Sequence, residues 1–252
     1  MALALGLALS LGIGLSLGLI GGGGSIITVP VLVYVMGVPP HRAVGMSLAV
    51  VGSTALVGAF LHDRRGAVAW RTGAVFAASG IASAYLGSKL TRSLTPSALL
   101  LLFAGVMLVA GLVMLTRKER PEHTVVAHVP SLWREVLAGF GVGFLTGFLG
   151  VGGGFLIVPA LVLFGGLPIR VAIGTSLFVI AVNCAAGLIG HLTVGDTDWT
   201  LTGLVSALAI AGALAGTALS RRFHPRGLRR VFAWFVVAVA LFLIYRNYNA
   251  LL

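Results

Sequence analysis

Hydrophobic residues along this chain come in long, nearly uninterrupted runs. Residues 2–20, 68–86 and 97–115 carry one charge between them, Arg71. About 18 or more apolar residues in a row are enough to cross the hydrocarbon of a membrane as a helix. No stretch alternates apolar and polar positions with a period of two, as an outer-membrane barrel would require. The pattern therefore predicts an all-α polytopic membrane protein.

The same pattern occurs twice in the chain. Pro30 and Pro159 lie 129 residues apart, and this ungapped offset pairs many further Gly, Pro, His and Trp residues. Among these pairs are Gly21 with Gly150, Gly23 with Gly152, Ser47 with Ser176, His62 with His191, and Trp70 with Trp199. We therefore expect a first repeat at residues 1–115 and a second at 136–252. The polar segment 116–135 is predicted to join them as a cytoplasmic linker.

Each half is predicted to contain a broken helix. An apolar helix runs into a glycine cluster at residues 21–24 or 150–154, and a short helix follows at 25–36 or 155–164. These short helices are too short to span a membrane. Three full spans follow, near residues 43–61, 68–87 and 97–115 in the first half. Each half is thus predicted to be a glycine-broken re-entrant helical hairpin plus three transmembrane helices.

The basic residues predict the orientation, because Lys and Arg favour cytoplasmic loops. If each broken segment crossed the membrane once, the two faces would receive 8 and 9 of the 17 Lys and Arg residues. If it enters and returns, the split is 13 to 4, with only Arg42, Lys89, Arg92 and Arg246 on the less basic side. The second arrangement makes the two repeats inverted and puts both termini outside the cytoplasm. Two full crossings would give the same split, and the shortness of the second arm favours a re-entrant hairpin.

The composition supports a membrane protein and excludes several other classes. Hydrophobic residues make up 58% of the chain and charged residues 9%, whereas soluble domains carry about 25% charged residues. The net charge of +11 is explained by topology signals in short loops, so no nucleic acid is expected as a partner. The one cysteine, Cys184, excludes a disulfide within the chain. Residues 2–20 lack a basic n-region and a clear cleavage site, so we expect a retained helix rather than a signal peptide.

Paired, glycine-interrupted segments in inverted repeats are typical of secondary transporters, whose substrate site lies where the breaks meet. Each short helix begins at the tip of its hairpin, and a helix N-terminus favours an anion. All six acidic residues fall in loops or at span ends, so we expect no buried carboxylate to bind a cation. The sequence therefore predicts a small anionic substrate.

The candidate site combines the two breaks with polar residues of the following spans. The predicted substrate-binding residues are Gly22, Gly23, Gly24, Ser25, Thr28, Gly152, Gly153, Gly154, Ser47, Ser176 and Asn183. Ser25 and Thr28 are expected to supply hydroxyl donors, and Asn183 is included because a buried amide needs partners. No metal and no cofactor is expected.

Other polar and small residues have less specific interpretations. Ser53, Thr54 and Thr175 are expected to form hydrogen bonds between helices, and Gly12 and Ser16 to allow close helix packing. His62 and His191 end their spans, and they are predicted to act either as gates or proton acceptors or as interfacial anchors.

Two motifs resemble a known family. The sequence Gly-Gly-Gly-Gly-Ser-x-x-x-x-Pro at 21–30 and its copy Gly-Val-Gly-Gly-Gly-x-x-x-x-Pro at 150–159 resemble the sulfite exporter TauE/SafE family. Pro-x-x-Ala-x-Gly-x-Ser at 40–47 resembles it too, and its copy departs from the pattern because Ile169 replaces the proline. The resemblance covers nearly the whole chain. It implies transport of sulfite, sulfoacetate or related sulfonates across a cell inner membrane.

The sequence disfavours two other functions and leaves a third open. A rhomboid-like intramembrane protease would need Gly-x-Ser-Gly, but Leu48 follows Ser47, and no enzyme activity is expected. No Gly-x-x-x-x-Gly-Lys-Ser/Thr loop is present for ATP-driven transport. A passive anion channel, or a permease component for another small solute, is the alternative that the sequence leaves open. A homo-oligomer in the lipid bilayer is also compatible with it.

Overall fold

The computed structural model describes residues 2–90, 96–116, 132–149, 154–192, 198–220, 222 and 225–248, and all regular structure in this part of the chain is helical. The first half contains α1 (Ala2–Ile20), α2 (Gly24–Pro30), the π-helical turn η1 (Val31–Val35), α3 (Pro40–Asp63), α4 (Trp70–Leu90) and α5 (Pro96–Thr116). The second half contains α6 (Leu132–Leu149), α7 (Gly154–Leu163), α8 (Ile169–Leu192), α9 (Trp199–Ser220) and α10 (Pro225–Tyr248).

The helix boundaries repeat along the chain. Helices α3 and α8 both have 24 residues, and they begin and end at positions related by the offset between Pro30 and Pro159. The starts of α4 and α9, and of α5 and α10, are related in the same way. Helix α6 begins at Leu132, inside the segment predicted as the linker.

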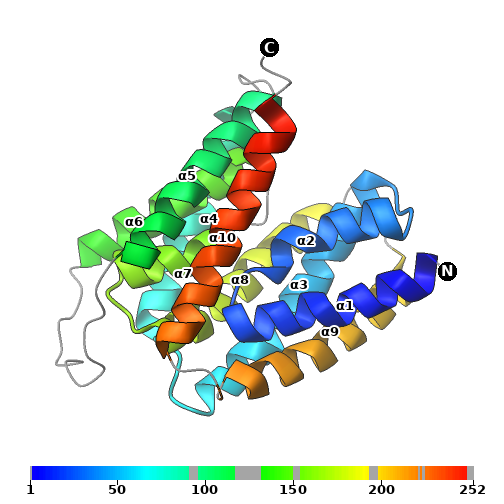
Figure 1. The fold of residues 1–252 in the computed structure, drawn as a ribbon, viewed down its shortest axis with the longest axis horizontal. Helices are drawn as coiled ribbons and strands as arrows, with labels where there is room; N and C mark the ends of the chain where they lie inside the picture. Colours follow the sequence, from blue (N-terminus) through cyan, green and yellow to red (C-terminus); the bar gives the residue numbers. More distant parts are fainter. Residues whose placement is uncertain are drawn as a thin grey trace.

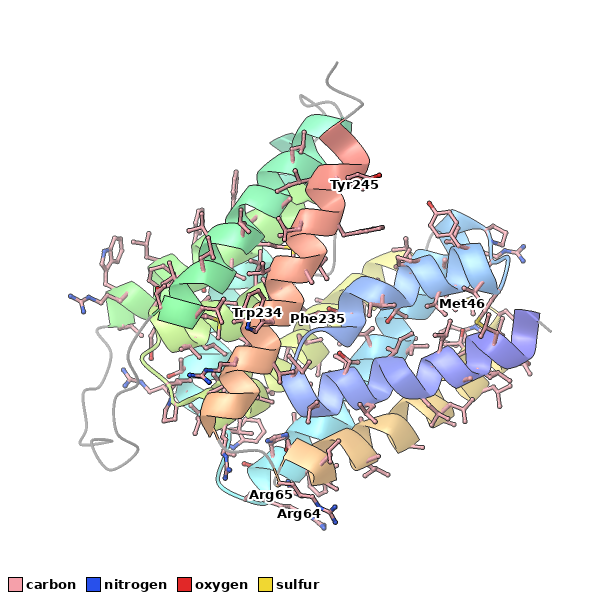
Figure 2. All side chains as sticks on the ribbon, viewed as in Figure 1. Met46, Arg64, Arg65, Trp234, Phe235 and Tyr245 are labelled. Atoms are coloured by element: carbon pink, nitrogen blue, oxygen red, sulfur yellow. The ribbon has the colours of Figure 1, made fainter. Side chains whose placement is uncertain are left out.

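Three helices in the described part of the chain are long and apolar enough to cross a membrane. They comprise Arg42–Asp63, Ile169–Ile189 and Trp199–Ser220. Large apolar side chains also lie on the outside, among them Leu56 (61% exposed) and Trp234 (61% exposed). Figure 2 shows Trp234 and Tyr245 along α10. An apolar outer surface on apolar helices is the surface that lipid covers, so the chain is a multi-pass membrane protein.

The first half folds back on itself at its glycine cluster. Gly24 packs against Ile13 and Leu17 of α1, and Gly6 near the start of α1 packs against Met36 at the end of η1. The segment from α2 to Met36 therefore runs back along α1 as a hairpin (Figure 1). Pro30 lies inside this arm and has no N–H to donate, and the helix changes from α to π directly after it.

The two halves exchange helices. Helix α1 packs on α9 and α6 packs on α4, which are corresponding pairs (Figure 1). Gly14 and Gly18 of α1 lie against the backbone carbonyls of Ala209 and Ala213. Since the residue numbers rise together on both helices, α1 and α9 run parallel. Glycine lets the two backbones come this close, as it commonly does between membrane helices.

The prediction that Gly12 packs between helices is wrong. A Cβ atom at Gly12 would have nothing within 4 Å, and the residue is exposed. The glycine stripe that contacts α9 lies at Gly14 and Gly18 instead. Ser16 does lie in a packed region, because a Cβ atom at Gly23 would be 2.8 Å from its hydroxyl.

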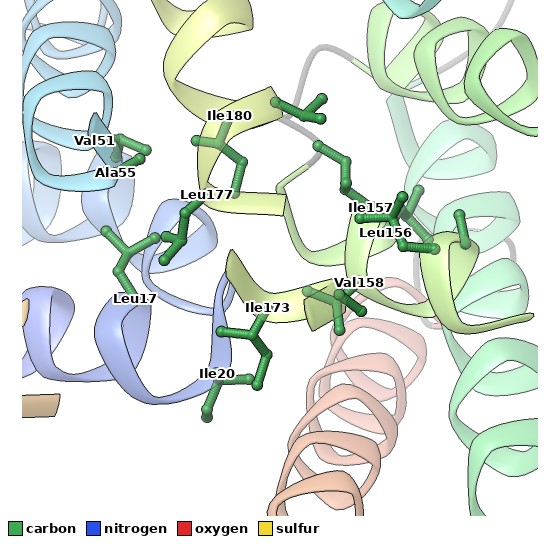
Figure 3. Close-up of a cluster of buried hydrophobic side chains, with 14 of the residues drawn as sticks. Leu17, Ile20, Val51, Ala55, Leu156, Ile157, Val158, Ile173, Leu177 and Ile180 are labelled. Carbon is green, nitrogen blue, oxygen red and sulfur yellow. The ribbon is translucent and has the colours of Figure 1, made fainter. Parts of the chain in front are cut away.

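Helices α3 and α8 cross at the centre of the molecule. Gly52 meets Cys184, Gly58 meets Leu177, and Leu48 meets Gly187. The numbers rise on one helix and fall on the other, so these corresponding helices run antiparallel. The largest buried apolar cluster surrounds the crossing, and Figure 3 shows its side chains converging from α1, α3, α7 and α8.

Candidate functional site

The first glycine break is held by the second half of the chain. Gly21 adopts φ of +80°, a conformation that side chains other than glycine disfavour. Ser176 Oγ on α8 lies 2.8 Å from the carbonyl oxygen of Gly21 and 2.7 Å from that of Ile173, so its one proton can be donated to either. A Cβ atom at Gly21 would lie 2.8 Å from this hydroxyl. Ser176, predicted as a site residue, therefore fixes the end of α1.

The hydroxyl groups of the first break donate hydrogen bonds to carbonyls of their own segment. Ser25 Oγ donates to the carbonyl of Gly22 at 2.7 Å, and Thr28 Oγ1 donates to that of Gly24 at 2.8 Å. Both side chains are buried. In this conformation neither hydroxyl proton is free for a ligand, contrary to the role expected for them.

Two of the predicted glycines are also required by packing. A Cβ atom at Gly23 would lie 2.9 Å from the ring of Phe235, and one at Gly24 would lie 2.7 Å from Leu17 Cγ and clash with the carbonyl of Ile13. The absence of side chains here lets α2 approach α1 and α10. Close packing therefore explains these two positions without a ligand.

The two breaks meet at Gly154 and Ser25. A Cβ atom at Gly154 would lie 2.8 Å from Ser25 Oγ and 2.9 Å from Ile180 Cδ1. Gly154 and Ser25 occupy positions related by the 129-residue offset, so corresponding points of the two halves lie against each other. Gly152 and Gly153 lie outside the described residues.

Further predicted site residues lie on α3 and α8, the helices that follow the two short helices along the chain. Ser47 is buried and corresponds to Ser176. Asn183 lies seven residues after Ser176, nearly two helical turns, and therefore on the same face of α8. Its Oδ1 atom is buried without a hydrogen-bond partner.

Thr54 lies seven residues after Ser47 and therefore on the same face of α3, and the hydrogen bond between helices that the sequence predicts for it is not formed. Thr54 is fully buried, and its Oγ1 has no hydrogen-bond partner. The signal that could have identified it is the repeat itself, because the same offset maps Thr54 onto Asn183. Thr175, in contrast, accepts a hydrogen bond from the Ala69 amide at 2.9 Å.

Of the two histidines predicted as gates, proton acceptors or interfacial anchors, the structure describes the side chain of His62. His62 is buried (5% exposed); it lies near the backbone of Gly18 and packs against Gly174. Its Nε2 is buried and unpartnered, so His62 lies between α1 and α8 rather than at a lipid interface. His191 is in the last turn of α8, and its side chain lies outside the described residues.

The expectation that no carboxylate is buried is wrong for Glu135. This residue is 1% exposed, and its Oε1 accepts a hydrogen bond from Thr72 Oγ1 at 2.7 Å. It lies in the first turn of α6, whereas the second break follows the other end of that helix. At 1.5 Å per residue the two are about 20 Å apart, so Glu135 is not part of the candidate site.

No group of three or more His, Cys, Asp or Glu residues that could hold a metal occurs within the described ranges. In the described part of the site, the polar groups are backbone amides, hydroxyl groups and the amide side chain of Asn183. Such groups bind by hydrogen bonding, and this suits a small polar or anionic ligand.

Comparisons with known proteins agree with these features. The family profile described as "Sulfite exporter TauE/SafE" matches residues 6–243. A "Probable membrane transporter protein" of Xylella fastidiosa strain 9a5c is 36% identical over 240 residues, which cover 92% of this chain and 91% of the relative. The "Probable membrane transporter protein YdhB" of Bacillus subtilis is 30% identical over 201 residues, with 78% and 82% coverage.

No solved structure matches the chain significantly. The family profile spans nearly the whole chain, including both glycine breaks and the α3–α8 crossing between them. The chain therefore belongs to the sulfite exporter TauE/SafE family of membrane transporters.

Proposed function

We propose that this protein is a secondary transporter that exports small anions of the sulfite or organosulfonate type. Its site is where the two glycine breaks meet. The observation that carries the proposal is the contact between Gly154 and Ser25, which brings the two breaks together. Transporters built from inverted repeats bind their substrates at such a point.

An inverted topology of the two repeats is part of the proposal. It is supported by the antiparallel crossing of the corresponding helices α3 and α8 and by the 13-to-4 division of basic residues. The return of α2 and η1 along α1 supports a re-entrant hairpin in the first half. We place the protein in the inner membrane with both termini outside the cytoplasm.

The anionic nature of the substrate follows from the charges around the site. Helix α7 begins at Gly154, and the N–H groups of a first helical turn lack acceptors within the helix. These groups and the helix dipole favour an anion. The one carboxylate found buried in the described residues, Glu135, is too distant to neutralise them. The name of the matching family favours sulfite among small anions.

The test is a flux measurement on the purified protein in proteoliposomes. Radiolabelled sulfite, sulfoacetate and thiosulfate are followed with and without a pH gradient, and protein-free liposomes serve as the control. We expect saturable flux that responds to the gradient. Flux that rises linearly with concentration and ignores the gradient would favour a passive anion channel. If none of these anions moves although the protein is inserted, the proposed function is wrong.

A further inference from the structure

Thr54 and Asn183 lie at the centre of the α3–α8 crossing. Thr54 is between Gly52 and Gly58, both of which contact α8, and Asn183 is next to Cys184, whose Cβ would be 3.0 Å from a Cβ atom at Gly52. Both residues are therefore at the same level of the crossing. They also occupy corresponding positions in the two repeats, as Ser25 and Gly154 do.

The face of α8 that carries Asn183 also carries residues that contact the two glycine breaks. Ser176 and Asn183 share one face of α8, seven residues apart. Along this face Ser176 contacts Gly21, and Ile180 lies against Gly154. Asn183 is about one turn beyond Ile180. By the repeat, Ser47, Val51 and Thr54 form the equivalent face of α3.

Both residues keep a buried polar atom without a partner. Thr54 Oγ1 and Asn183 Oδ1 form no hydrogen bond, although neither atom is accessible to solvent. A threonine in a helix usually donates to a carbonyl one turn earlier, and the neighbouring Ser53 does so, with Oγ 3.1 Å from the carbonyl oxygen of Val50. Because a buried polar group without a partner lowers stability, two such groups at corresponding central positions call for an explanation.

We propose that Thr54 and Asn183 are the side chains that hydrogen-bond the transported anion and set its selectivity. The inference rests on the proposed function, since it names two side chains that bind the substrate in the same site. The threonine hydroxyl donates one hydrogen bond. The asparagine amide presents an oxygen and, after rotation by 180°, two N–H donors.

This pair fits a small oxyanion better than a halide. Donors on two different helices can each bind a separate oxygen of one oxyanion, whereas a halide offers one centre. The amide oxygen can also accept a hydrogen bond from the O–H group of a singly protonated oxyanion. The two repeats differ at this position, Thr in one and Asn in the other, so each repeat presents a different group to the ligand.

The experiment uses shape-conserving variants of the full-length protein in proteoliposomes. Thr54→Val and Asn183→Leu remove the polar atoms, and Ser53→Ala is the matched control because its hydroxyl is already bonded within α3. Sulfite flux is measured as a function of concentration, alone and in competition with chloride, and thermal unfolding is followed in detergent.

We expect KM for sulfite to rise about tenfold in each of the two site variants, with weaker discrimination against chloride. The control should stay within about twofold of the wild type. Thr54→Val should also unfold at or above the wild-type temperature, because it removes a buried hydroxyl that has no partner.

Two results would overturn the inference while leaving the proposed function intact. One is normal KM and selectivity in both site variants. The other is a lower unfolding temperature for Thr54→Val, since its hydroxyl would then have a structural partner. If the wild type moves no anion, the proposed function itself fails, and this inference fails with it.

Discussion

At the residue scale, the two breaks are joined by very small groups. Gly154 has no side chain, and Ser25 turns its hydroxyl back to Gly22. A methyl group at Gly154 would already lie 2.8 Å from Ser25 Oγ, closer than carbon and oxygen normally approach. Any larger side chain must therefore push the two breaks apart.

We predict that Gly154→Val abolishes anion flux while the protein still inserts into the membrane. The isopropyl group would displace Ser25 and Ile180 and so disrupt the meeting point. Gly12→Val is the matched control, because a Cβ atom at Gly12 has nothing within 4 Å. Flux and membrane insertion are measured in parallel for both variants. Wild-type flux from Gly154→Val would place the substrate path elsewhere.

At the element scale, corresponding helix pairs are stabilised by glycine-mediated contact between backbones. Gly212 and Gly216 of α9 lie against the carbonyls of Leu11 and Leu15, as Gly14 and Gly18 of α1 lie against those of α9. On the other side of the molecule, Gly143 of α6 lies against Gly80 of α4. Between apolar helices in lipid, this close approach provides the packing energy that the hydrophobic effect does not.

The expected result for Gly212→Leu is a loss of about 1–3 kcal/mol in the free energy of unfolding, the usual effect of overpacking. The cause is the clash of any Cβ at this position with the carbonyl of Leu11. Gly203→Leu on the same helix is the control, because a Cβ atom there meets nothing within 4 Å. The unfolding temperatures of the two variants are measured in detergent. Equal temperatures would show that close packing of Gly212 against α1 does not stabilise the protein.

At the scale of the whole molecule, the arrangement of the halves has a consequence for sidedness. Arg71 and Thr200 are corresponding residues at the starts of α4 and α9, and both are exposed. In an inverted pair of repeats, corresponding residues face opposite sides of the membrane. The basic loop with Arg64 and Arg65, seen at one end of the molecule in Figure 2, is the side we assign to the cytoplasm.

This arrangement is tested with single cysteines in a Cys184→Ala background. A membrane-impermeant thiol reagent added to intact cells should label Thr200→Cys and leave Arg71→Cys unlabelled. Inside-out vesicles should give the reverse. If both positions react from the same side, the repeats are not inverted.

Much of this architecture could be predicted from the sequence, since the repeat and the apolar runs predicted most helices to within a few residues. The rotation of each helix about its axis could not. In lipid, the face toward protein and the face toward the membrane are both apolar, so periodicity does not separate them. For this reason the sequence does not show that Gly12 faces away from the protein and that Gly14 lies against α9.

For the same reason the sequence does not predict that Glu135 is buried. It also does not predict that Ser25 and Thr28 donate hydrogen bonds to carbonyls of their own segment. The sequence does predict Asn183 as a site residue, because a buried amide needs hydrogen-bond partners. For Thr54 the sequence predicts only a hydrogen bond between helices, which polar side chains in membrane helices commonly form. The repeat pairs it with Asn183, and the crossing of α3 and α8 puts the two residues at the same level.

The exchange of helices between the halves affects how the protein is made. Helix α9 begins at Trp199, about 180 residues after α1 ends, and at 5–20 residues per second the ribosome needs roughly 10–35 s to reach it. During that interval α1 lies in the bilayer without α9, the helix that covers Gly14 and Gly18. The N-terminal half therefore cannot mature before the C-terminal half has been inserted. A nascent chain that stops after α5 should be recognised by membrane quality control as unfinished.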